Sequence, residues 1–233
     1  MTADGMTSWR SALQSLAAAV GLFACISVAA AGELDGSYDA QGRTPDGKAY
    51  SGDVLMKSFG RTEAVLWRLQ GNQGYKGIGI VSGGVLGAAY AADKSYFGVV
   101  IYDVRGGILD GVWTAVSDPK ATGREVLEGP ASLDGTYKIT TGEQLDGVTN
   151  YSGQVVIKPN GKTYLVAWLG PSQSPAPIAM GVGILADTKL VVAFGKDRIP
   201  GVVAYRIDGK HLEGVWASGG SHQTGTETLI RKP

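Results

Sequence analysis

The sequence predicts an all-β protein in which two tandem small antiparallel up-and-down β-barrels, of about eight strands each, follow an N-terminal signal peptide. Three observations lead to this fold. Glycine accounts for 36 of the 233 residues, well above its usual share of roughly 7%, which is typical of a chain with many turns. Apolar and polar residues alternate with a period of two, and one ordered set of short phrases occurs twice.

The first element is an apolar run from Ser11 to Ala31, which Arg10 precedes and a polar Gly-Glu pair follows. A basic residue, a short apolar segment and an exit of small residues are typical of a secretory signal peptide. We therefore expect cleavage after Ala31 and export to the periplasm or the cell exterior. Two alternatives stay open: an uncleaved signal that anchors the chain in a membrane, and lipid attachment at Cys25. Cleavage would remove the only cysteine, so no disulfide is expected.

The rest of the chain is a tandem repeat, and we place a signal peptide at residues 1–31, a first barrel module at 32–129 and a second at 130–233. Each copy carries the same phrases in the same order. Four matched pairs are Leu34–Tyr38 with Leu133–Tyr137, Tyr50–Gly52 with Tyr151–Gly153, Leu109–Trp113 with Leu212–Trp216, and Gly123–Leu127 with Gly225–Leu229. Because one copy is long enough to bury a core of its own, we expect each copy to close its own barrel.

Within a copy, the alternation and the turn residues predict short strands joined by hairpins. Tyr164, Val166 and Trp168 alternate with their neighbours, as in a strand with one buried face. Asn160-Gly161 and Asp208-Gly209 suit type I′ turns, which need positive φ at both central residues. In the second copy we expect strands that begin near residues 133, 151, 163, 179, 189, 201, 211 and 224. Closure into a barrel would remove the sheet edges; a sandwich or propeller arrangement of four-stranded sheets is the alternative.

The charge balance and the residue counts argue against several kinds of site. Lys and Arg together number 21, as do Asp and Glu, so the chain lacks the basic field that nucleic-acid binding needs. One cysteine and two histidines, His211 and His222, do not suggest a zinc site, and we expect no metal and no other cofactor. Gly181–Ala186 fits the letters of a dinucleotide fingerprint, but another strand rather than a helix follows it.

Two glutamates are the polar residues of most interest, because each is in phase with an inward leucine. Glu125 precedes Leu127 by two residues, and Glu227 precedes Leu229 in the same way, so both carboxylates should point into a barrel. One interpretation is a structural lock in which the carboxylate accepts hydrogen bonds from a Trp indole or a Tyr hydroxyl. The other is a polar anchor for a ligand in the barrel mouth. No catalytic residue is predicted.

An aromatic set occupies the same inner faces, and it either fills the core or lines a pocket. With the two glutamates it forms the candidate ligand-binding set: Trp67, Tyr102, Trp113, Glu125, Trp168, Tyr205, Trp216 and Glu227.

The order of the repeated phrases resembles that of exported bacterial tandem-repeat proteins of mostly unknown role, some of which carry the label fibronectin-binding. This resemblance implies an exported β-protein that binds something, and it implies no particular binding residues. The phrase Gly214-Val215-Trp216 is also faintly similar to patterns in lipocalin- and avidin-like barrels, where the likeness is architectural only.

These observations favour a non-enzymatic exported binding protein. In the first version, the two modules engage a macromolecule such as a matrix or host protein or an envelope glycan, and duplication raises avidity. In the second version, each barrel carries a small apolar ligand, as calycins do. A hydrolase that uses Glu125 or Glu227 is the third alternative.

Overall fold

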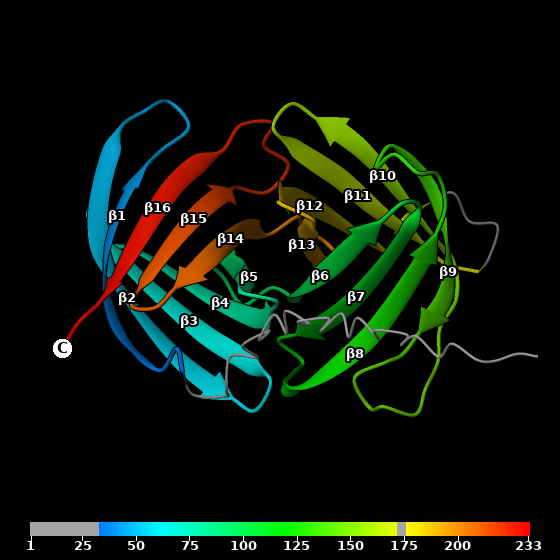
Figure 1. Cartoon of the computed structure of the whole chain (residues 1–233), viewed down its shortest axis with the longest axis horizontal. Coiled ribbons are helices and arrows are strands. Elements are labelled where there is room, and N and C mark those ends of the chain that lie inside the picture. The colour runs from blue at the N-terminus through cyan, green and yellow to red at the C-terminus, as the bar shows by residue number, and fades with distance from the viewer. Residues whose placement is uncertain (1–32, 172–175) are drawn as a thin grey trace, which may run out of the picture.

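The structure is a computed structural model that describes residues 33–171 and 176–233. In this part of the chain it is all-β, as predicted, with two closed eight-stranded antiparallel barrels (Figure 1). The described residues contain no helix that is long and apolar enough to cross a membrane. The predicted signal peptide and Cys25 lie outside the described residues.

The described residues form sixteen consecutive strands, eight in each sequence copy. In the first copy they are β1 (Gly36–Arg43), β2 (Ala49–Phe59), β3 (Thr62–Leu69), β4 (Gln73–Ser82), β5 (Val85–Ala91), β6 (Phe97–Arg105), β7 (Ile108–Ala115) and β8 (Asp118–Glu128). In the second copy they are β9 (Gly135–Gly142), β10 (Gln154–Asn160), β11 (Thr163–Leu169), β12 (Ala179–Ala186), β13 (Lys189–Gly195), β14 (Gly201–Asp208), β15 (His211–Ala217) and β16 (Gly225–Arg231). The strands of the second copy begin within a few residues of the expected positions.

The two copies exchange strands, so the prediction that residues 32–129 and 130–233 each close their own barrel is wrong. The first barrel consists of β1–β5 and β14–β16, and the second barrel consists of β6–β13. The expected boundary between residues 129 and 130 therefore lies inside the second barrel, between the paired strands β8 and β9. Figure 1 shows the red and orange C-terminal strands beside the blue and cyan N-terminal ones.

Equivalent pairing explains why the exchange is possible. β5 pairs with β14 rather than with β6, and β13 pairs with β6 rather than with β14. Because Gly201–Tyr205 in β14 repeats Gly98–Tyr102 in β6, either strand offers β5 nearly the same ladder. The links between the barrels, residues 92–96 and 196–200, are joined by an ion pair between Asp93 and Arg198 at 2.7 Å.

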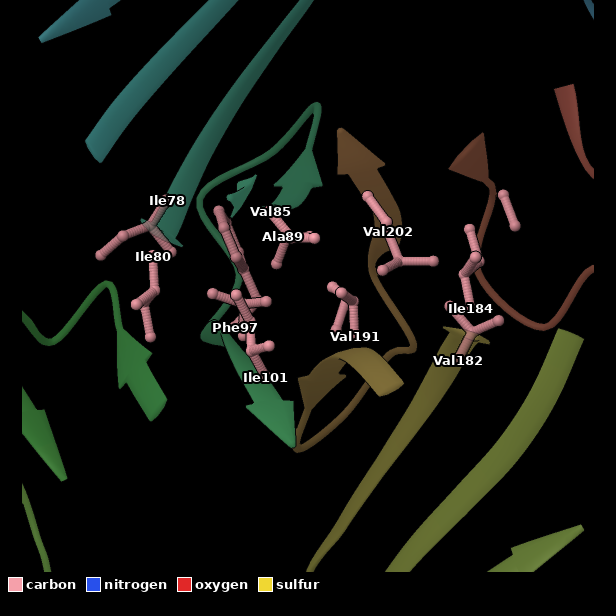
Figure 2. Packing of buried hydrophobic residues seen from close by; sticks show 14 residues of the cluster. Ile78, Ile80, Val85, Ala89, Phe97, Ile101, Val182, Ile184, Val191 and Val202 are labelled. Carbon is pink, nitrogen blue, oxygen red and sulfur yellow. The ribbon is translucent and has the colours of Figure 1, made fainter. Parts of the chain in front are cut away.

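A third apolar cluster lies between the barrels and buries the outer faces of β4–β6 and β12–β14. Figure 2 shows Ile78, Phe97 and Ile101 on one side of this cluster and Val191 and Val202 on the other. As a consequence β5, β6, β13 and β14 are buried on both faces and lose the polar alternation of a one-sided strand. Ala204, whose neighbours Val203 and Tyr205 belong to the core of the first barrel, lies on the outer face of β14 and is only 4% exposed.

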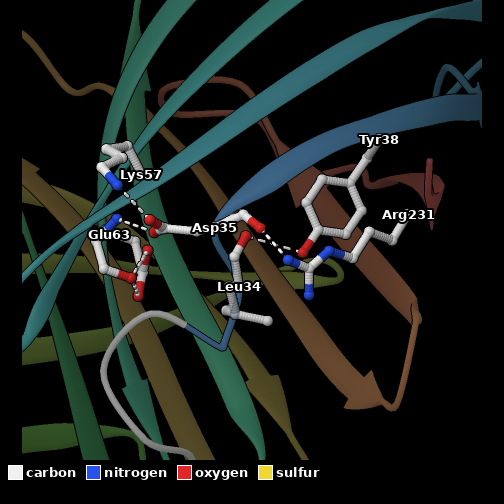
Figure 3. Close-up of polar contacts among 7 residues, drawn as sticks. Leu34, Asp35, Tyr38, Lys57, Glu63 and Arg231 are labelled. Atoms are coloured by element: carbon white, nitrogen blue, oxygen red, sulfur yellow. Dashed lines mark hydrogen bonds and ion pairs between the residues drawn. The ribbon is translucent and has the colours of Figure 1, made fainter. Parts of the chain in front are cut away.

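One end of the first barrel is closed by the residues that precede β1 (Figure 3). The Tyr38 hydroxyl donates to the Leu34 carbonyl oxygen at 2.9 Å, and Leu34 is buried in the barrel core. The Asp35 carboxylate accepts from the Ser58 amide at 2.6 Å and pairs with Lys57. These contacts, led by the Lys57 hydrogen bond, lower the pKa of Asp35 to about 2. The Arg231 guanidinium donates to the Glu33 carbonyl oxygen at 2.9 Å, so the start of β1 and the end of β16 are held together.

Candidate functional site

The end of the first barrel that lies opposite Leu34 and Asp35 is termed here the mouth. It contains a cavity of about 420 Å³. Its rim includes the β1–β2 loop, with Thr44 and Lys48, and the β3–β4 turn, with Gln70. Its wall carries six aromatic side chains, each from a different strand: Tyr50, Trp67, Tyr75, Tyr90, Tyr205 and Trp216. A pocket of this size with mostly aromatic walls is within the usual range for small-molecule sites.

The aromatic rings of the wall pack on one another in two groups. Tyr90 lies 5.8 Å from Trp67 and 5.4 Å from Tyr75, measured between ring centroids. Tyr50 lies 6.2 Å from Trp216 in an edge-to-face arrangement. Such contacts stabilise the wall, and they hold the rings in place without a ligand.

Glu227 lines the same cavity from β16 and is 5% exposed. Its Oε1 accepts from the Trp67 indole nitrogen at 3.0 Å and from the Tyr205 hydroxyl. Its Oε2 accepts from the Tyr50 hydroxyl at 3.0 Å. The cluster joins both sequence copies, because Tyr50 and Trp67 come from the first copy and Tyr205 and Glu227 from the second.

The second barrel contains the matching cluster around Glu125, which is 2% exposed. Glu125 Oε1 accepts from the Trp168 indole nitrogen at 3.1 Å and from the Tyr102 hydroxyl, and Oε2 accepts from the Tyr151 hydroxyl at 2.9 Å. The hydrogen bonds predicted for a structural lock are therefore present in both barrels. Two of these hydrogen bonds join the two sequence copies, since Glu125 and Tyr102 belong to the first copy and Tyr151 and Trp168 belong to the second.

Burial raises the pKa of both glutamates, and the hydrogen bonds from their Tyr and Trp neighbours oppose this effect in part. In the described part of the chain, neither carboxylate forms an ion pair with a Lys or Arg side chain. Burial, followed by the nearby carboxylate, raises the pKa of Tyr50 and Tyr205. The two tyrosine hydroxyls and the one tryptophan indole around each carboxylate thus stay protonated at neutral pH.

The two barrels differ in how their interiors are filled next to the glutamate. At the place where the first barrel has Tyr90, the second has Phe194, whose ring lies 6.0 Å from Trp113 and 5.5 Å from Trp168. Leu145, in the loop that joins β9 to β10, also packs on this core. The corresponding loop of the first barrel, residues 44–48, is shorter and contributes the polar Thr44 and Lys48 to the cavity.

The two remaining tryptophans show the same difference. The Trp113 indole nitrogen donates to the Glu143 carbonyl oxygen at 3.1 Å. The Trp216 indole nitrogen is buried and forms no hydrogen bond of regular geometry with the described residues, although its contact with the Tyr50 hydroxyl partly offsets the raised pKa of that group. Trp216 thus leaves a donor unsatisfied at the wall of the cavity, whereas its counterpart in the second barrel is satisfied by the backbone.

All eight candidate residues lie inside the barrels. Four line the cavity of the first barrel: Trp67, Tyr205, Trp216 and Glu227. The other four lie in the interior of the second barrel: Tyr102, Trp113, Glu125 and Trp168. Sequence reasoning did not assign Tyr50 and Tyr151 to the site, although the repeated Tyr-Ser-Gly phrase that contains them was the signal that could have found them.

No protein-family model and no curated protein sequence matches this chain. The described residues also contain no group of three or more His, Cys, Asp or Glu side chains that could hold a metal ion.

Proposed function

We propose that the protein is an exported, non-catalytic binding protein that holds one small, largely apolar molecule in the mouth of the first barrel. The observation that carries this proposal is the cavity of about 420 Å³, whose wall is made of six aromatic rings and one buried carboxylate. Export is proposed from the apolar run that ends at Ala31.

The contrast between the barrels supports a role in binding for the first one. Both barrels have a buried Glu with three donors, so the lock alone does not require a cavity. In the second barrel Phe194 and Leu145 occupy the interior near the lock. In the first barrel Tyr90 takes the place of Phe194, but the shorter loop 44–48 supplies no counterpart of Leu145 and a cavity remains. An unfilled cavity costs packing energy, and a bound ligand would restore the lost contacts. We therefore propose one site per chain, rather than the one per barrel expected from the sequence.

A hydrolytic role is less well supported than binding. Glu227 is the only acidic side chain among the described residues that line the cavity, and glycoside hydrolysis, the usual chemistry of such carboxylates, needs two. Binding of a macromolecule through the outer surface is the remaining alternative.

Native mass spectrometry of the full chain, purified from its own host, tests the proposal. We expect a ligand adduct that disappears in Val203→Phe, because Val203 is buried and lines the cavity. The matched control is Val148→Phe, at a side chain that is 82% exposed, and it should keep the adduct. An unmodified mass for the wild-type chain, together with capture of a glycan or matrix protein that survives Val203→Phe, would favour the macromolecular alternative.

A further inference from the structure

The chemistry of the cavity selects a class of ligand, and this inference rests on the proposed function. We infer that the first barrel binds an organic cation, a protonated amine attached to an apolar or aromatic body, with the ammonium group against Glu227 and the body against the aromatic wall.

The inner polar atoms around Glu227 offer acceptors to a ligand. The Tyr50 hydroxyl, the Tyr205 hydroxyl and the Trp67 indole nitrogen all donate to the carboxylate, at 3.0 Å for Tyr50 and Trp67. A hydroxyl has one proton and an indole nitrogen has one, so these donors are used. The main acceptor capacity that remains is on the carboxylate, where Oε2 accepts only one hydrogen bond from the described residues. The Tyr205 oxygen already accepts from the Trp67 indole nitrogen at 3.2 Å. A ligand group that reaches the carboxylate itself must therefore donate, while the unsatisfied donor of the wall, the Trp216 indole nitrogen, lies beside Tyr50.

The charge at the same point is negative and lacks a basic partner. Glu227 is 5% exposed, and its three hydrogen-bond partners are neutral. A buried carboxylate without a counter-ion is costly, and a ligand that brings a positive charge offsets that cost. Lys48 is the basic residue that lines the cavity, and it lies on the exposed rim in the β1–β2 loop, where water screens its charge.

The wall suits a cation as well as an apolar body. Tyr and Trp rings present negative faces, and a cation within about 6 Å of a ring centroid is attracted to it. Six such rings line this one cavity. A carboxylate at one point and aromatic faces on several sides together distinguish an ammonium ion from a neutral alcohol and from an anion of the same shape.

Isothermal titration of the full chain with three probes of similar shape tests the inference: 2-phenylethylamine, 2-phenylethanol and 3-phenylpropanoate. At pH 7.5 we expect the amine to bind at least tenfold more tightly than the alcohol, and the anion to bind most weakly. In Glu227→Gln the preference for the amine should disappear, since the charge is lost and the shape is kept. The matched control is Glu125→Gln, which makes the same change in the filled barrel and should leave the preference intact.

The pH dependence of amine affinity gives a second test, which uses only the wild-type chain and does not depend on whether a variant folds. Because burial raises the pKa of Glu227 above the usual value of a glutamate, amine affinity should rise as pH rises through that raised pKa and the carboxyl loses its proton. The groups that face this carboxyl are Tyr50 from β2, Trp67 from β3 and Tyr205 from β14, with Tyr90 and Trp216 nearby and Lys48 at the rim. The pKa values of the three tyrosines lie above their usual value, so none of them titrates in the same pH range. The affinity of the alcohol should not change with pH.

The outcomes separate this inference from the proposed function. If the alcohol binds as tightly as the amine and Glu227→Gln has no effect, the cation is wrong and the small-molecule site stands. If the anion binds most tightly, the inference is overturned in favour of a ligand that pairs with Lys48. If no probe binds and no adduct is found on the purified chain, both the inference and the proposed function fail.

Discussion

The exchange of strands between the copies predicts which strands a mutation in one barrel core destabilises. Leu229→Ala tests this prediction. Leu229 lies on β16 in the second sequence copy, and its side chain is fully buried in the core of the first barrel, with Tyr38, Ala40 and Leu212. Its Cα pairs with those of Ala40 and Leu212 on the two neighbouring strands. Removal of this side chain should therefore weaken β1–β5, which lie far from it in sequence.

The magnitude follows from the burial of the side chain. Truncation of a fully buried leucine to alanine costs about 2–5 kcal/mol, depending on how far the cavity collapses. A loss of about 3 kcal/mol raises the population of the open state roughly a hundredfold. Amides of the first barrel that exchange by cooperative opening should thus lose protection by a similar factor.

Hydrogen exchange followed by mass spectrometry of peptides is the assay. We expect Leu229→Ala to reduce protection in β1–β5 and β14–β16. The matched control is Leu127→Ala, at the equivalent fully buried leucine of the second barrel, which should reduce protection in β6–β13. A loss of protection in β9–β13 after Leu229→Ala, with β1–β5 unchanged, would refute the exchanged arrangement, because it would mean that each copy closes its own barrel.

Three further predictions follow from the same structure. A protease site placed after Pro130 and then cut should leave both halves in one particle on size exclusion, because β5–β14 and β6–β13 still pair; halves that separate in native buffer would contradict this. Gly214→Ala should lower the free energy of unfolding by roughly 1–3 kcal/mol through overpacking, because a Cβ there would lie 2.4 Å from the Tyr205 ring. The melting temperature should fall accordingly, and an unchanged melting curve would show that the ring moves freely. Burial raises the pKa of Glu125, so this group favours folding below the unfolded pKa, and that contribution is lost as pH rises through the folded pKa. The free energy of unfolding, measured in urea, should therefore fall less between pH 4.5 and pH 7 in Glu125→Gln than in the wild type. An identical fall in both proteins would show that Glu125 does not cause the pH dependence.

The strands and the inward glutamates could be predicted because their causes are local. A period of two places Glu125 on the face of Leu127, and the hairpins occur where they were expected. The predicted type I′ turns are wrong, because Asn160 and Asp208 end their strands and only Gly161 and Gly209 have positive φ, 63° and 58°. The partner of β5 could not be predicted in the same way. β6 and β14 share the phrase Gly-Val-Val-x-Tyr, so the choice between them depends on the packing of the two barrels rather than on any local signal.

The sequence patterns also could not predict that the first barrel contains a cavity while Phe194 and Leu145 pack in the second. The aromatic phrases are shared by both copies, and the open or filled state depends on residues that differ between them. Tyr90 and Phe194 occupy equivalent places, and Leu145 has no counterpart in the shorter loop at residues 44–48. Whether such residues fill a barrel depends on how they pack, which alternation alone does not specify.

The exchange also changes what the duplication accomplishes. If each copy closed its own barrel, a cluster of Tyr, Trp and Glu would belong to one copy and could be kept or lost with it. In the observed arrangement, Tyr50 and Trp67 of the first copy hold Glu227 of the second, and Tyr151 and Trp168 of the second hold Glu125 of the first. Neither copy contains a complete cluster within one barrel. Both copies are therefore needed to build the cavity of the first barrel, and the second barrel, with its filled interior, provides the support that keeps β14–β16 in place through the shared apolar cluster.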